Sequence, residues 1–72
     1  MNSRQFNLVF MNRLDTIRKN KHWSIPVICE MFDDVITEKE YRWYQKGIQT
    51  PSPALVLKAV DVFGRDAFGE VN

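Results

Sequence analysis

The chain has 72 residues, of which 44% are hydrophobic and 26% are charged; this composition excludes a disordered chain, and this length allows only one small domain. Its formal net charge of +1 is low for a dedicated nucleic-acid binder, so that function would require positive charge to be concentrated on one face. One cysteine excludes an internal disulfide, and neither a membrane-spanning apolar run of roughly 20 residues nor the apolar core of a signal peptide is present, so we expect a cytoplasmic protein.

The first predicted helix begins at about Phe6, after polar residues 1–5, which we expect to be frayed. Its evidence is an apolar stripe with the spacing of one helical face, formed by Phe6, Phe10, Leu14 and Ile17. Lysine and arginine side chains near its end suit the negative end of the helix dipole. The stripe predicts an amphipathic helix that ends before Trp23.

A second, short helix is predicted to begin after Ser24, whose hydroxyl can cap backbone N–H groups, and Pro26 is tolerated in its first turn. We expect Cys29 to be a small buried side chain of this helix. Asp33 and Asp34 are predicted to end the helix, because two carboxylates at a helix C-terminus are electrostatically unfavourable.

The strongest helix signal lies over residues 37–47. Thr37 can cap the start, and Glu40, three residues later, can complete a capping box by reaching back to the Thr37 N–H. Gly47 can take the left-handed conformation that closes a helix, and Pro51 blocks any continuation. The chain is therefore predicted to turn directly after this third helix.

The two sides of this third helix differ in chemistry. Tyr41 and Tyr44 fall on one side, which we expect to pack into the core. The other side is basic, carries a tryptophan and is expected to face solvent; it consists of Lys39, Arg42, Trp43 and Lys46. We interpret this outward face as the functional surface, either for DNA or for another protein.

A fourth helix is predicted from Ser52, a good N-cap, with Pro53 at its first position. An apolar stripe then runs to Gly64, which closes the helix. The tail, residues 65–72, is expected to hold one more short turn anchored by Phe68.

No stretch of the chain alternates with the period of a strand, and no internal repeat is visible. The sequence therefore predicts an all-α fold of four to five helices. We expect a single domain over residues 1–72, with its core at about 6–64.

The order of these elements resembles the Xre/Cro-type helix-turn-helix domain of phage and bacterial repressors. The segments that carry the resemblance are residues 12–18 in the first helix, Trp23 and Ser24 at the start of the second, Ile28 and Cys29 within it, and residues 47–51 (Gly-Ile-Gln-Thr-Pro) before the last apolar helix. The resemblance implies a lambda-repressor-like fold. It also implies a phage or mobile-element transcription regulator that acts in the cytoplasm of a bacterial host cell.

In domains of this type the third helix enters the DNA major groove and the second crosses the backbone, so the resemblance implies double-stranded operator DNA as the partner. Arg42 and Lys39 could then read guanine edges. The expected DNA- or partner-binding residues are Thr37, Glu38, Lys39, Arg42, Trp43, Lys46 and Gln49, with Lys21 and Ser24 as phosphate contacts. A chain this small is expected to bind as a homodimer.

Several residues depart from the pattern of that family and leave a second function open. Gln45 stands where the family often has a glutamate paired with a first-helix arginine, so Arg18 would bond to this amide or turn elsewhere. Four acidic side chains cluster where a phosphate backbone would approach: Asp33, Asp34, Glu38 and Glu40. The alternative is an antirepressor, which uses the same fold to bind the DNA-binding domain of a repressor protein.

Phe6, Val9 and Phe10 are a candidate dimer or partner surface, although a Phe6–Phe10 pair is more often internal packing. Trp23 is expected in the core, whereas Trp43 either faces outward or lies half-buried. The chain has no catalytic residue order, no phosphate-binding loop and no metal-ligand spacing, so we expect no enzyme activity, cofactor, metal or small-molecule ligand.

Overall fold

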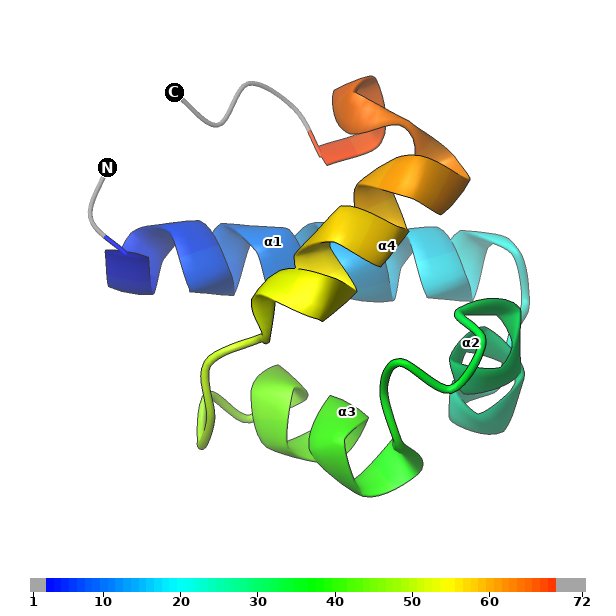
Figure 1. Ribbon diagram of the computed structural model, residues 1–72, viewed down its shortest axis with the longest axis horizontal. Helices are drawn as coiled ribbons and strands as arrows, with labels where there is room; N and C mark the ends of the chain where they lie inside the picture. Colours follow the sequence, from blue (N-terminus) through cyan, green and yellow to red (C-terminus); the bar gives the residue numbers. More distant parts are fainter. Residues whose placement is uncertain (1–2, 69–72) are drawn as a thin grey trace.

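Residues 3–68, the part of the chain that this computed structural model describes, form four α-helices and one short 3-10 helix and contain no strand (Figure 1). The all-α prediction is confirmed for these residues. The elements are α1 (Ser3–Asn20), α2 (Ile25–Met31), α3 (Glu38–Gln45), α4 (Pro53–Phe63) and η1 (Arg65–Phe68). None of these helices is long and apolar enough to cross a membrane.

The long helix α1 supports the rest of the structure. In Figure 1, α3 lies below α1, α2 lies beside the C-terminal end of α1, and α4 crosses in front of it. α3 contacts both α1 and α2, and η1 turns back onto α1 and α4. One side of α3 therefore packs toward α1, and the opposite side has no other element over it in this view (Figure 1).

Each short helix begins at a side-chain cap that the sequence predicts. The hydroxyls of Ser24 and Ser52 accept the backbone N–H three residues on, at 3.4 and 3.2 Å. Thr37 accepts the Glu40 N–H at 3.1 Å, and the Glu40 carboxylate accepts the Thr37 N–H at 3.0 Å, which completes the capping box. These bonds satisfy N–H groups that have no partner inside the helix. The starts of α2, α3 and α4 are thus fixed by local chemistry.

Two helix boundaries differ from the sequence prediction. α1 begins at Ser3 rather than near Phe6, because polar residues add turns to a helix that its apolar stripe already stabilises. The third helix spans Glu38–Gln45, shorter than residues 37–47, since Thr37 and Lys46 are its capping residues. Gly47 adopts the left-handed conformation expected for it, with φ of 76°.

The turn between α2 and α3 contains two consecutive aspartates in the left-handed region. Asp33 and Asp34 have φ of 53° and 59°, values that favour glycine but that aspartate tolerates better than most residues. Their backbone N–H groups donate to the carbonyls of Glu30 and Cys29, each at 3.0 Å, and so close the end of α2. The Lys58 ammonium of α4 holds the Asp33 carboxylate at 2.7 Å. This turn therefore lets α3 leave α2 without a glycine.

The core lies between α1 and the other helices. Its most buried large side chains come from every α-helix and from the α2–α3 turn: Leu14, Ile28, Phe32, Ile36, Tyr41 and Leu55. Cys29 is buried as expected, and burial raises the pKa of its thiol. Trp23 is half-buried at the edge of the core, with its ring 6.0 Å from that of Phe63.

Of the two interpretations of Phe10, a partner surface or internal packing, the structure shows internal packing. Its side chain is 3% exposed, because the ring of Phe68 in η1 stacks over it with the centroids 5.1 Å apart. Phe6 also stacks on Phe10, with the ring centroids 6.3 Å apart, and is half-buried against the core. The aromatic stripe at the front of α1 is therefore mainly internal packing, and the core extends to Phe68.

Candidate functional site

The outward side of α3 carries the cations that the sequence places there. Lys39, Arg42 and Lys46 are exposed and Trp43 is half-buried. On the inward side, Tyr41 is 0% and Tyr44 6% exposed. The helical period explains the split, since residues three and four apart share a face. This face, called the α3 outer face below, consists of Lys39, Arg42, Trp43 and Lys46.

The charges of the α3 outer face are only weakly engaged with their neighbours. The Lys39 ammonium lies 5.0 Å from the centre of the Trp43 ring, a cation–π contact that leaves its N–H groups open to solvent. Arg42 faces Glu38 at 3.9 Å, and both side chains are about half exposed, at 55% and 51%. Such an exposed pair contributes about 0.2–0.5 kcal/mol. Each cation can therefore turn toward an incoming anion at little cost.

The other expected site residues lie at the two ends of α3. Thr37 is exposed, but its hydroxyl is already an acceptor in the capping box. Gln49 is exposed in the α3–α4 loop, where it lines a groove of about 440 Å³ together with Lys46 and with Asn7 and Leu8 of α1. The groove brings Gln49 beside Lys46.

Lys21 and Ser24 lie apart from that groove. They belong to the connection between α1 and α2, which Figure 1 places at the opposite end of the molecule from the α3–α4 loop. Ser24 is exposed, and its hydroxyl caps α2. The Lys21 ammonium lies over the rings of Trp23 and Phe63, at 5.3 and 5.8 Å from their centres. Lys21 therefore stabilises the α1–α2 connection through these contacts and also places a positive charge at the surface.

An acidic flank borders the α3 outer face at its N-terminal end. It is formed by exposed carboxylates of α2, the α2–α3 turn and α3: Glu30, Asp33, Asp34 and Glu38. Asp33 is paired with Lys58, and Glu38 is weakly paired with Arg42. The sequence predicts Asp33, Asp34, Glu38 and Glu40 for this cluster; the first three are exposed, whereas the Glu40 carboxylate is bound in the capping box.

A polar cluster beneath α3 was not predicted from the sequence. One oxygen of Asp15, Oδ1, accepts hydrogen bonds from the Tyr41 hydroxyl at 2.7 Å, from the Gln45 amide at 3.2 Å and from the Arg18 guanidinium at 3.1 and 3.2 Å. Arg18 also donates to the Trp23 carbonyl at 2.8 Å. Of the two alternatives left open for Arg18, the structure shows the second, because Arg18 donates to Asp15 and to the Trp23 carbonyl and shares the Asp15 oxygen with Gln45 rather than bonding to the amide itself. We call Asp15, Arg18, Tyr41 and Gln45 the Asp15 cluster.

Electrostatics in the Asp15 cluster follow from burial and these bonds. Burial alone would raise the pKa of Asp15, but hydrogen bonds from Tyr41, Lys19 and Arg18 outweigh it and bring the pKa below its ordinary value. Burial and the bond to Asp15 raise the pKa of Tyr41 far above its usual range, so its hydroxyl stays protonated. The pairing of Asp15 with Arg18 and Lys19 could be predicted from the sequence, because these residues are three and four positions apart on one helix. The bond to Tyr41 on α3 could not be predicted in this way, because 26 residues separate Asp15 from Tyr41.

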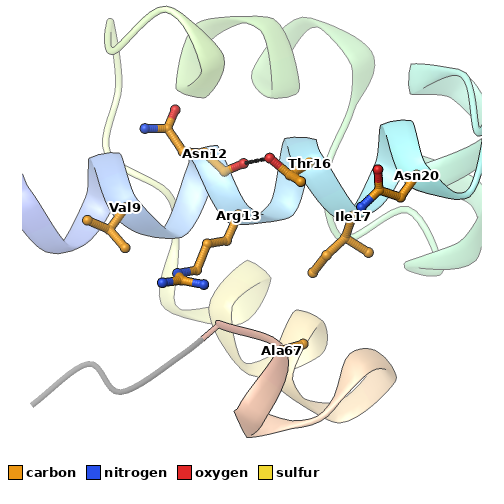
Figure 2. A pocket seen from close by; sticks show the side chains of 7 residues that line it. All are labelled: Val9, Asn12, Arg13, Thr16, Ile17, Asn20 and Ala67. Carbon is orange, nitrogen blue, oxygen red and sulfur yellow. Dashed lines mark hydrogen bonds between the residues drawn. The ribbon is translucent and has the colours of Figure 1, made fainter.

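A second depression, of about 510 Å³, runs along the outer side of α1 (Figure 2). Its lining comes from one face of α1 and from η1: Val9, Asn12, Arg13, Thr16, Ile17, Asn20 and Ala67. Thr16 donates to the Asn12 carbonyl at 2.8 Å, as Figure 2 shows. Val9 therefore lies here, on a surface separate from the α3 outer face. Arg13 is the one titratable group in this lining.

Among residues 3–68, no group of histidine, cysteine, aspartate or glutamate side chains is placed to hold a metal ion. Comparison with known proteins gives no further indication of the chemistry. No family model, no curated protein and no solved structure matches the chain.

Proposed function

We propose that this chain is a transcription regulator of the Xre/Cro helix-turn-helix type from a phage or mobile element, and that it binds operator DNA through α3. The observation that carries the proposal is the α3 outer face, where three cations are exposed while the tyrosines of the same helix are buried. In a helix-turn-helix domain this is the helix that enters the major groove. The resemblance of the sequence to Xre/Cro-type domains also supports α3 as the DNA-binding helix.

Each residue of the α3 outer face has a role in this proposal. Arg42 and Lys39 donate to guanine O6 and N7, the acceptors that the major groove presents. Lys46, at the end of α3, neutralises a phosphate and so positions the domain without reading sequence. Trp43 packs against a sugar or a thymine methyl. The acidic flank limits affinity, because its carboxylates repel phosphate when α3 enters from that end.

A binding assay with random-sequence duplexes tests the proposal. The duplexes that bind at low salt are selected and sequenced, and the affinity of the best one is then measured against salt. Log affinity should fall by about 0.9 for each log unit of salt per phosphate neutralised, so the one phosphate contact assigned to Lys46 gives a slope of about 0.9 per chain. No retained duplex at low salt would refute DNA binding.

Arg42→Ala should relax the sequence preference and cost about 1–3 kcal/mol of specific binding. The matched control is Arg13→Ala, which removes an equally charged, exposed side chain from the depression on α1. The control should lose little affinity and keep the preference. Equal losses from both variants would mean that general charge, not α3, holds the DNA.

The acidic flank favours a second candidate function, that of an antirepressor. The four exposed carboxylates of the acidic flank suit a basic protein surface, such as the recognition helix of a repressor. The test is co-elution of this chain with the DNA-binding domain of a repressor encoded next to it. Asp34→Asn should weaken such a complex, whereas Asp61→Asn on α4 should not. Trp43→Ala should cost about 2 kcal/mol or more if Trp43 anchors the complex.

A further inference from the structure

The depression on α1 combines two rows of side chains that run along the helix (Figure 2). Residues four apart share a row and lie about 6 Å from each other along the axis. One row is polar and consists of Asn12, Thr16 and Asn20. The other row is apolar at both ends and cationic in the middle, and it consists of Val9, Arg13 and Ile17. In Figure 2 the second row points toward the side of α1 on which Ala67 of η1 lies. The depression therefore offers one positive charge between two apolar side chains, with polar groups alongside.

Arg13 has no anionic partner in the part of the chain that the structure describes. It is exposed, and no described carboxylate lies within ion-pair distance of its guanidinium. Arg18, on the same helix, is instead paired with Asp15 at 3.1 Å. An exposed arginine alone is ordinary, so the inference depends on the side chains beside it. Here the charge stands between Val9 and Ile17, which are half-buried and so remain partly open to contact.

We propose that the depression on α1 binds an extended peptide segment of another protein, which carries an acidic side chain at its centre and an apolar side chain two residues before and two residues after it. Alternate residues of an extended chain project to the same side, about 6.6–6.8 Å apart. That repeat is close to the spacing of about 6 Å within each row of α1. The central carboxylate therefore reaches Arg13, where a guanidinium can donate two parallel hydrogen bonds, while the apolar side chains reach Val9 and Ile17. Because the pattern is the same in both chain directions, the pairing does not depend on which way the segment runs.

The polar row supplies partners for the backbone of such a segment. An extended chain has N–H and C=O groups along its edge, and these need hydrogen bonds where the contact displaces water. The Asn12 and Asn20 side chains are exposed, and each amide offers donors and an acceptor. The Thr16 hydroxyl donates to the Asn12 carbonyl at 2.8 Å, which leaves its oxygen able to accept a peptide N–H. The row therefore suits a backbone edge on which donors and acceptors alternate.

The charges of the lining favour a peptide over a nucleic acid. Phosphates follow one another along a nucleic-acid strand, so a groove for single strands has cations along its length and aromatic rings for the bases. Among the described residues that line the depression, Arg13 is the one cation and none is aromatic. A small inorganic anion would engage Arg13 alone and leave Val9 and Ile17 uncovered. This surface is separate from the α3 outer face, so the inference goes beyond the proposed function and can hold or fail without it.

An NMR titration of the isotope-labelled full chain with two synthetic peptides tests the inference. The probe is Ser-Leu-Ser-Glu-Ser-Leu-Ser with both ends blocked. The control is Ser-Leu-Glu-Ser-Ser-Leu-Ser, which has the same composition but places its carboxylate on the opposite side of the extended chain. The probe should bind with a dissociation constant of roughly 0.1–1 mM, since so short a segment loses much freedom on binding, and about tenfold more tightly than the control. Signals of Arg13, Ile17 and the Asn12 and Asn20 side-chain amides should shift. No shift at these residues up to about 2 mM probe, or equal affinity for both peptides, overturns the inference.

Charge reversal at Arg13 provides the second measurement. Because Arg13 is exposed, Arg13→Glu should fold as the wild type does, which circular dichroism checks. The variant should bind the probe at least about fivefold more weakly and should prefer a peptide with lysine in place of the central glutamate. Arg65→Glu, the same reversal at an exposed position of η1 outside the lining, should keep the wild-type preference. Unchanged affinity of Arg13→Glu for the probe overturns the inference. A single-stranded thymidine oligonucleotide that moves the same signals more strongly than the probe also overturns it, in favour of a nucleic-acid site.

Discussion

The hydroxyl of Tyr41 on α3 donates a 2.7 Å hydrogen bond to Oδ1 of Asp15 on α1. Tyr41 is 0% exposed, so this bond forms where the ring enters the core. Gln45, one turn later on α3, donates to the same oxygen at 3.2 Å. Two points on the inward side of α3 are thereby attached to one atom of α1. The direction in which the α3 outer face points follows from this attachment.

Removing the Tyr41 hydroxyl should destabilise the domain without leaving a void. Tyr41→Phe keeps the ring and deletes one donor to a charged acceptor, which typically costs about 1.5–3 kcal/mol. Urea unfolding followed by circular dichroism measures the loss. A change below about 0.5 kcal/mol would mean that Arg18 and Gln45 alone satisfy Asp15, and that the hydroxyl is dispensable.

Stability at low pH should depend on Asp15. Its pKa is lower in the folded chain than the ordinary value of 3.8, so the ionised carboxylate favours folding at pH values above about 4. That contribution is lost as the pH falls through the folded pKa. Wild type should therefore exceed Asp15→Asn in stability at pH 7, and the gap should narrow as the pH is lowered from about 4 toward 2. A gap that stays constant over this range would show that the charge of Asp15 is not what the asparagine lacks.

The α2–α3 turn offers a stabilising substitution. Asp34 has φ of 59°, a conformation that glycine adopts without strain. Asp34→Gly should raise the free energy of unfolding by about 0.5–1 kcal/mol. Asp33→Gly is the matched comparison, because Asp33 has φ of 53° but also binds Lys58 at 2.7 Å. It should gain less than Asp34→Gly in urea unfolding. The reverse order would mean that the ion pair with Lys58 contributes nothing.

Features that depend on neighbouring residues were readable from the sequence, and features that depend on distant contacts were not. The caps at Ser24, Thr37 and Ser52 follow from side chains that reach the next turn of the same chain, and all three are confirmed. The burial of Tyr41 follows from helical period, but its bond to Asp15 requires knowing how α3 sits on α1. The local pattern pairs Asp15 with Arg18 and Lys19 along α1, but it does not select Asp15 among the nine acidic residues as the partner of Tyr41.

For the same reason, the sequence could not decide whether Phe10 packs internally, as the structure shows, or belongs to a partner surface. The apolar stripe of α1 shows which side of the helix is apolar, but not how many elements cover that side. Phe68, from the tail, covers Phe10 at a ring distance of 5.1 Å. An apolar stripe on a first helix has the same sequence pattern whether a partner chain or the protein's own C-terminal turn covers it.

The contribution of η1 to stability tests whether Phe68 is the residue that keeps Phe10 buried. Phe68 is 4% exposed and contacts the rings of both Phe10 and Phe63, at 5.1 and 6.4 Å. Phe68→Ala should cost about 3–5 kcal/mol, a large part of the stability of so small a domain, and should expose Phe10. Urea unfolding gives the loss, and binding of a hydrophobic dye reports the exposed surface. Arg65→Ala, an exposed position of the same turn, should change neither. If Phe68→Ala lowered stability by less than about 1 kcal/mol, η1 would be peripheral, and Phe10 would again be a candidate for contact with a partner.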